Sequence, residues 1–192
     1  PLHNDAFGVE WTRVEENQEW VVGEAALRLP PDAPFSLVWP IINGRLDPHR
    51  PLHAVIGDLA RILEHAIVTE LGIAKSSIPS HAVIFVLDDQ LCNTPSALEA
   101  FVRMALFDLR LRAVTVQRAS VAGTFGAGVP SALIIDIGAH STTAACIEDG
   151  LLVAGSLVSV PVGGDDLAAL FLDLCRLNHM PLAGIDPMRP LD

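Results

Sequence analysis

Apolar residues recur at helical spacing in one long segment, between Leu52 and Leu71. This pattern predicts an amphipathic helix, and Gly72 stands where a glycine commonly ends one. The apolar stripe consists of Val55, Leu59, Ile62, Leu63, Ala66 and Ile67.

Other segments are continuous apolar runs rather than periodic ones. The runs Ala82–Leu87 and Ala132–Asp136 are predicted to be strands buried on both faces, because such strands carry no polar alternation. Leu111–Val116 is predicted to be a further strand. Between these strands we expect a helix from Thr94 to about Asp108, which opens with a hydroxyl residue and a proline, and a short helix over 119–127.

The last third of the chain is predicted to hold a hairpin followed by a helix. Ser141–Ile147 and Leu151–Val160 are expected to pair across the turn Glu148–Gly150, whose composition is typical of tight turns. A pair of glycines then leads into a helix from about Asp165 to Leu177.

The first 50 residues carry weaker signals. Glu19–Val22 is predicted to be a short strand, Pro30–Pro34 a rigid loop, and Asn43-Gly44 a tight turn. The order of strands and helices along the whole chain predicts an α/β fold, with a sheet covered by helices on both faces.

Composition narrows the class of protein. The chain has 192 residues, of which 51% are hydrophobic, and 12 Lys+Arg against 23 Asp+Glu give a formal net charge of -11. This hydrophobic content excludes intrinsic disorder. The negative charge argues against a grip on nucleic acid, which requires a basic patch. An acidic surface could face basic partners such as histone tails, or could simply aid solubility.

We expect neither a membrane-spanning segment nor a zinc site. The longest uncharged stretch, Ala119–Ile135, is interrupted by glycines and a proline and is too short to cross a bilayer. Three cysteines at wide spacing fit reduced thiols in the cytosol or nucleus and match no zinc pattern. The chain starts at Pro1 without a leader-like segment, and we expect it to be a piece of something longer.

The segment that follows the strand ending at Asp136 has the composition of a phosphate site. Gly138 would let the backbone approach an anion, and the hydroxyl residues Ser141, Thr142 and Thr143 follow it. Successive amides in such a turn can form a concave set of donors, and an acid at the strand end can hold Mg²⁺ through water. The alternative is an ordinary strand–turn–strand in which Asp136 caps the loop.

The motif Asp-x-Gly-x-x-x-Thr, formed by Asp136, Gly138 and Thr142, resembles the second phosphate loop of the superfamily of actins, sugar kinases and heat-shock chaperone ATPases. Three further segments are similar to actin segments in the same order, from about Trp20 to Pro181: "WVVGEAALRLPPDAPFSLVWPIINGRLD", "SVAGTFGAG" and "VPVGGDDLAALF". Within the superfamily the chain looks most like the nuclear actin-related proteins.

This resemblance implies part of an actin-like (ribonuclease H-like) ATPase fold, a mixed sheet flanked by helices. The implied organisation is an irregular segment over 1–18, a small-subdomain segment over 19–50, an α/β domain over 51–180 and a tail over 181–192. The implied nucleotide is ATP or ADP with Mg²⁺ held through water by Asp136. The implied cofactor-binding residues are Asp136, Ile137, Gly138, Ala139, His140, Ser141, Thr142 and Gly164.

Two departures from the actin pattern bear on chemistry. The glutamine that positions water in actins is replaced by Ala119, since Gln117 is out of register, and the second acid of the loop is replaced by Ala139. Alanine neither orients water nor holds the water shell of a metal, so we expect no catalytic residue and little or no hydrolysis. The first phosphate loop and most of the adenosine contacts of an actin have no counterpart here, so we expect this segment alone to bind nucleotide weakly or not at all.

The resemblance also implies partners. We expect a structural or regulatory subunit of an INO-type ATP-dependent nucleosome remodeller, located in the nucleus and involved in transcription regulation and DNA repair. Its partners would be the motor subunit, actin, another actin-related protein and the nucleosome with its histones, without direct DNA contact by this segment. The alternatives are an active ATPase or kinase of the same superfamily and an unrelated α/β binding module.

Other candidate residues are weaker. The acid pairs Asp88-Asp89 and Asp165-Asp166 could serve in acid–base chemistry, but adjacent side chains point apart. Three histidines lack carboxylate or cysteine neighbours at the spacing of metal ligands: His49, His53 and His65.

Overall fold

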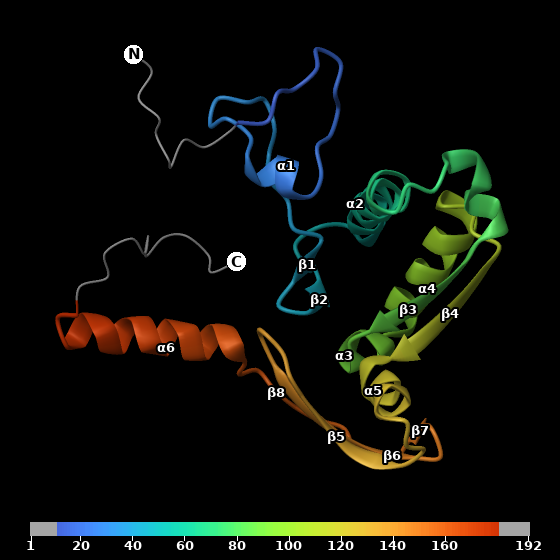
Figure 1. The fold of residues 1–192 in the computed structure, drawn as a ribbon, viewed down its shortest axis with the longest axis vertical. Coiled ribbons are helices and arrows are strands. Elements are labelled where there is room, and N and C mark those ends of the chain that lie inside the picture. The colour runs from blue at the N-terminus through green and yellow to red at the C-terminus, as the bar shows by residue number, and fades with distance from the viewer. Residues whose placement is uncertain (1–10, 181–192) are drawn as a thin grey trace. The chain divides into compact units, whose positions relative to one another are not determined.

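The structure, a computed structural model, describes residues 11–180 and divides into two compact units. Of the described residues, unit 1 holds 11–85 and 94–115, and unit 2 holds 86–93 and 116–180. Figure 1 shows the order of the helices and strands along the chain. The expected segment boundaries at residues 18, 50 and 180 stay a prediction, and residues 1–10 and the expected tail over 181–192 lie outside the described residues.

Unit 1 begins with a largely irregular segment. It holds the short helix α1 (Glu24–Leu27) and a two-stranded hairpin of β1 (Ile41–Ile42) and β2 (Arg45–Leu46). The turn residues Asn43 and Gly44 both have positive φ, 51° and 72°, as a two-residue turn of this kind requires, so the predicted tight turn is confirmed. The predicted strand Glu19–Val22 is wrong: these residues form no strand, because no segment within residues 11–180 pairs with their backbone.

The amphipathic helix of unit 1 is α2 (Leu52–His65), which continues into a π-helical turn over Ala66–Glu70. A 3₁₀ segment, Lys75–Ser80, then leads into strand β3 (Ala82–Leu87). The core of this unit forms around four buried residues, against which apolar side chains of α2 and β3 pack: Ile78, Ala105, Leu109 and Leu111. The predicted helix is therefore confirmed, with its last turn widened.

Strand β3 is followed by the short helix α3 (Asp89–Cys92) and by α4 (Pro95–Arg103), which ends in a π-helical turn over Met104–Asp108. Strand β4 (Ala113–Arg118) is the hydrogen-bonded neighbour of β3, and the two arrows run in the same direction in Figure 1. A helix between two parallel neighbouring strands is the connection that the alternating pattern predicts.

Unit 2 contains helix α5 (Ala119–Ala127) and a four-stranded sheet. The sheet is built from β5 (Ala132–Ile137), β6 (Thr142–Glu148), β7 (Leu151–Leu152) and β8 (Val158–Val160), and helix α6 (Gly164–Leu177) follows it. Strand β6 pairs antiparallel with β5, β7 and β8. The predicted hairpin is confirmed, although its second strand is divided into β7 and β8.

The expectation that the apolar strands are buried on both faces is wrong. Val121 of α5 packs with Ile134, Ala145 and Ile147 on one face of the sheet of unit 2. The opposite face of β5 is open, with Leu133 and Ile135 62% exposed and Ile137 68% exposed. An apolar run shows that neither face favours water, but it cannot show that this chain supplies a cover for both faces. Strand β3 has the same alternation of half-buried and exposed residues.

Among residues 11–180, no helix is both long enough and apolar enough to cross a membrane.

Candidate functional site

The bend between β5 and β6 is held by the register of these two strands. Asp136 pairs with Thr143, and Ile137 pairs with Thr142, so residues 138–141 connect the two strand ends. The backbone N–H of Gly138 donates to the carbonyl oxygen of Ser141 at 2.9 Å and closes the bend. The motif that sequence analysis singled out therefore lies at one end of the sheet of unit 2.

The bend is anchored on the first turn of helix α6. The N–H of Gly164 donates to the carbonyl oxygen of Gly138, and the N–H of Asp165 donates to that of Ala139, both at 2.9 Å. Gly163 is buried, and a Cβ atom at this position would overlap the carbonyl groups of Ala139 and Gly138. Gly164, which sequence analysis named as a cofactor contact, therefore contacts the bend instead. Its N–H is occupied by the carbonyl oxygen of Gly138.

Three successive backbone N–H groups of the bend remain without such a partner. Among residues 11–180, the N–H groups of Ala139, His140 and Ser141 donate to no other backbone group. These residues are exposed or half-buried rather than packed in the core. Successive N–H groups in a bend can act as donors to a phosphate group. Within residues 11–180, these three are not used by another backbone group.

The side chain of His140 connects the bend to helix α6. Its Nδ1 lies 3.0 Å from Oδ2 of Asp165, with side chains 43% and 60% exposed, and the two form an ion pair when the imidazole is protonated. The chain has no Lys or Arg between Arg118 and Arg176, so His140 is the one residue of this stretch that can become cationic. Sequence analysis named His140 as a phosphate contact but did not predict its pairing with Asp165.

The remaining residues of the predicted site have separate positions. Asp136 is exposed near the end of β5, where a carboxylate can hold the water shell of Mg²⁺, and no group of three or more possible metal ligands occurs within residues 11–180. The Thr142 hydroxyl donates to the carbonyl oxygen of Val162 at 2.8 Å. This contact ties the start of β6 to the segment that leads into α6.

Ala119 is the first residue of helix α5, and a neighbouring carboxylate holds this end of the helix. The buried side chain of Asp89 accepts hydrogen bonds from the N–H of Ser120 at 3.1 Å and from the Ser120 hydroxyl at 2.8 Å. Arg118 lies 3.6 Å from the same carboxylate. Sequence analysis considered Asp89 only for acid–base chemistry. The signal that could have revealed its role is the acid pair Asp88-Asp89 after an apolar strand, since one of two such acids can cap a helix.

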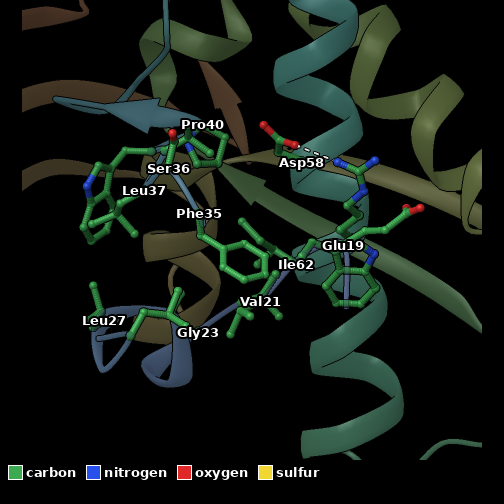
Figure 2. Close-up of a pocket in the computed structure, with 17 residues that line it drawn as sticks. Glu19, Val21, Gly23, Leu27, Phe35, Ser36, Leu37, Pro40, Asp58 and Ile62 are labelled. Carbon is green, nitrogen blue, oxygen red and sulfur yellow. Dashed lines mark hydrogen bonds and ion pairs between the residues drawn. The ribbon is translucent and has the colours of Figure 1, made fainter. Parts of the chain in front are cut away.

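Unit 1 contains a separate hollow of 430 Å³ between the segment 19–40 and helix α2. Figure 2 shows Phe35 and Val21 of this segment beside Ile62 of α2, and a link between Asp58 and Arg61. No residue of the bend lines this hollow. The sequence did not predict it, because its walls come from an irregular segment and a helix.

Comparison with known proteins identifies the family. The model of the actin family matches residues 54–186, which is more than half of the chain. The chain belongs to the actin family. The actin-like fold predicted from the Asp136–Thr142 motif and its flanking segments is thereby confirmed.

Relatives of this chain within the family include forms of actin-related protein 8. The zebrafish (Danio rerio) protein is 34% identical over 90% of this chain, and the human (Homo sapiens) protein is 31% identical over 91%. The solved structure "Human actin-related protein Arp8 in its ATP-bound state" is similar with a TM-score of 0.82 and 28% identity over 92% of this chain. The expected likeness to actin-related proteins is thus confirmed.

The match covers only part of these relatives. This chain spans 28% of the length of the zebrafish and human proteins and 36% of the solved chain. The family and the fold are established for this chain, whereas the roles of the individual bend residues stay predictions.

Proposed function

We propose that this chain is part of an actin-related structural or regulatory subunit of an ATP-dependent nucleosome-remodelling complex, which holds nucleotide at the bend and hydrolyses it slowly or not at all. The observation that carries the nucleotide part is the bend itself. Its three successive N–H groups without a backbone partner, at Ala139, His140 and Ser141, form a set of donors suited to phosphate.

The likeness to an actin-related protein solved with ATP supports the same assignment. In this proposal the backbone of 138–141 binds the phosphate groups, and Asp136 holds Mg²⁺ through water. The magnesium ion would neutralise phosphate charge, while the residues of this chain fix the position of the nucleotide. The rest of the nucleotide would be bound by other parts of an actin domain, so this segment alone would bind it weakly.

Two residues favour a weak or absent hydrolytic activity over the alternative of a working ATPase or kinase. Ala119 begins helix α5, and Ala139 lies in the bend. The resemblance places a water-positioning glutamine and a second acid at these points, and a methyl side chain replaces neither. Since phosphoryl transfer depends on positioning and charge stabilisation, nucleotide would serve mainly to stabilise the domain.

The proposed partners are the motor subunit of the remodeller, actin, a second actin-related protein and the nucleosome with its histones, all in the nucleus. The net charge of -11 favours a basic protein surface over direct contact with DNA, whose phosphates would be repelled. The test is copurification of the intact protein with a tagged motor subunit, with and without actin. Failure to copurify under both conditions would contradict the role as a subunit.

The nucleotide part is tested by replacing Gly138, whose Cβ would lie 3.2 Å from the carbonyl oxygen of Ser141, with leucine. We expect the intact protein to lose its thermal stabilisation by Mg·ATP, because the side chain fills the space next to the donors. The matched control is Gly126→Leu on α5, where an added Cβ meets nothing within 4 Å. An unchanged thermal shift in the Gly138 variant would exclude the bend as a phosphate site.

A further inference from the structure

We propose that Asp165 positions the His140 side chain as the cationic group that contacts the terminal phosphate of the bound nucleotide. This inference rests on the proposed function of the bend and adds a side chain to its backbone donors. It makes the affinity for nucleotide depend on the protonation of one residue.

The segment that forms the site is rich in acidic residues and poor in basic ones. Between Arg118 and Arg176 the chain carries acidic residues but no Lys or Arg. A nucleotide brings several negative charges to this segment, and backbone N–H groups supply only partial positive charge. His140 is therefore the one group in this stretch that can bring a full positive charge to a phosphate.

The pair of His140 and Asp165 lies at the bend itself. His140 is the middle residue of the three whose N–H groups lack a backbone partner. The backbone of Asp165 is tied to the same bend, because its N–H donates to the carbonyl oxygen of Ala139. The contact of 3.0 Å between Nδ1 of His140 and Oδ2 of Asp165 is thus supported by backbone hydrogen bonds on the same two segments.

The contact with Asp165 orients the imidazole ring of His140. A carboxylate next to one ring nitrogen fixes the orientation of the ring. With Nδ1 facing Asp165, Nε2 stays available as a donor, since it has no partner within residues 11–180. An ion pair as exposed as this one contributes little to stability, so stability alone does not account for it.

Three carboxylates lie on the elements next to the bend. Asp136 lies near the end of β5, and Asp165 and Asp166 lie in the first turn of α6. The carboxylate of Asp166 accepts a hydrogen bond from the N–H of Gly163, whereas Asp165 faces the imidazole. Asp165 is thus the carboxylate that the structure places against the His140 ring.

The test measures the affinity of the intact protein for Mg·ATP and Mg·ADP by titration calorimetry between about pH 6 and about pH 8, the range in which histidines change charge. We expect His140→Gln to weaken ATP binding about tenfold at the acidic end, as the loss of one charge-assisted hydrogen bond does. The variant should also lose the difference between the two pH values that the unmodified protein shows. Comparing chains at the same pH removes the titration of the nucleotide itself.

Asp165→Asn reports on positioning. We expect this variant to bind ATP more weakly but to keep the dependence on pH that His140→Gln loses, because the imidazole remains and only the group that orients it is lost. The matched controls are His53→Gln, on the exposed side of α2, and Asp173→Asn, which removes an exposed carboxylate paired with Arg176 on the same helix. Both controls should leave affinity and pH profile unchanged.

The outcomes separate the two proposals. If the unmodified protein binds ATP and His140→Gln binds it equally well at every pH, the role of His140 is wrong while the bend remains a nucleotide site. If the unmodified protein binds neither nucleotide at any pH, the proposed function and this inference fail together. Circular dichroism melting of each variant shows whether it is folded, and a shift of the His140 imidazole resonances on addition of Mg·ATP gives a readout that needs no substitution.

Discussion

The buried carboxylate of Asp89 binds Ser120 twice, through its backbone N–H at 3.1 Å and its hydroxyl at 2.8 Å. The side chain thereby caps the first turn of α5 from a different helix, α3. Only 3% of Asp89 is exposed, so the carboxylate depends on these hydrogen bonds and on Arg118 for the interactions that water would otherwise provide.

Removing this carboxylate should destabilise unit 2. We expect Asp89→Ala to lower the free energy of unfolding by about 2–3 kcal/mol, because the N–H and hydroxyl of Ser120 then lose their acceptor in a buried place. Urea unfolding followed by circular dichroism measures the effect. The control Asp173→Ala removes an exposed carboxylate and should change stability by less than about 1 kcal/mol. Equal stability of both variants would contradict a capping role for Asp89.

Two neighbouring glycines offer a matched test of the contact between the bend and α6. Gly163→Ala should lower stability by about 1–3 kcal/mol, because its Cβ would overlap the carbonyl groups of Ala139 and Gly138. Gly164→Ala should be tolerated, since its Cβ would lie 3.8 Å from the carbonyl oxygen of Gly138. Thermal unfolding of both variants distinguishes them. A similar melting temperature for the two would mean that the bend is not held against Gly163.

The proposal that Ala119 and Ala139 keep hydrolysis slow can be tested by restoring the two side chains of the actin pattern. We expect the double substitution Ala119→Gln and Ala139→Asp in the intact protein to raise the rate of phosphate release from Mg·ATP about tenfold or more, because water and metal regain polar partners. Each single variant serves as a control and should gain less. Rapid hydrolysis by the unmodified protein would instead favour the alternative of a working ATPase.

Two of the cysteines, Cys92 and Cys146, should differ in reactivity. Burial raises the pKa of the Cys92 thiol, the positive charge of Arg118 opposes this shift, and the carboxylates of Asp89 and Asp88 add to it. Since the thiolate is the reactive form, Cys92 should react with iodoacetamide much more slowly than the exposed Cys146 near pH 8, as judged by mass spectrometry of the folded protein.

The same shift has a consequence for stability. Because the folded state keeps the proton of Cys92 to higher pH than the unfolded state, its contribution to stability is complete below the ordinary titration range of a thiol and is lost as pH rises through the raised pKa. Replacement by serine should remove this part of the pH dependence. Labelling of Cys92 as fast as Cys146 in the folded protein would contradict the burial of this thiol.

Several features were predictable because they depend on residues close together in the chain. The turns at Asn43-Gly44 and Asp149-Gly150 require positive φ, which these residue types adopt readily, and all four residues have it. Helix α5 covers 119–127 as predicted, since Gly128 adopts the left-handed conformation that ends it. The bend at Gly138 was predictable in the same way, from a strand, a glycine and a second strand.

The tertiary structure decided what depends on distant residues. It placed the segment Glu19–Val22 in an irregular loop, because a strand needs a partner that the residues themselves do not specify. It left Leu133, Ile135 and Ile137 exposed, because burial depends on what covers a face.

The same reason applies to the candidate site. The amino-acid order determined that a tight bend follows β5, through local backbone preferences. It did not determine that Asp165 meets His140 or that Asp89 meets Ser120 across 31 residues of chain. Such contacts arise when helices and strands pack, since packing brings side chains together without regard to their separation in the sequence.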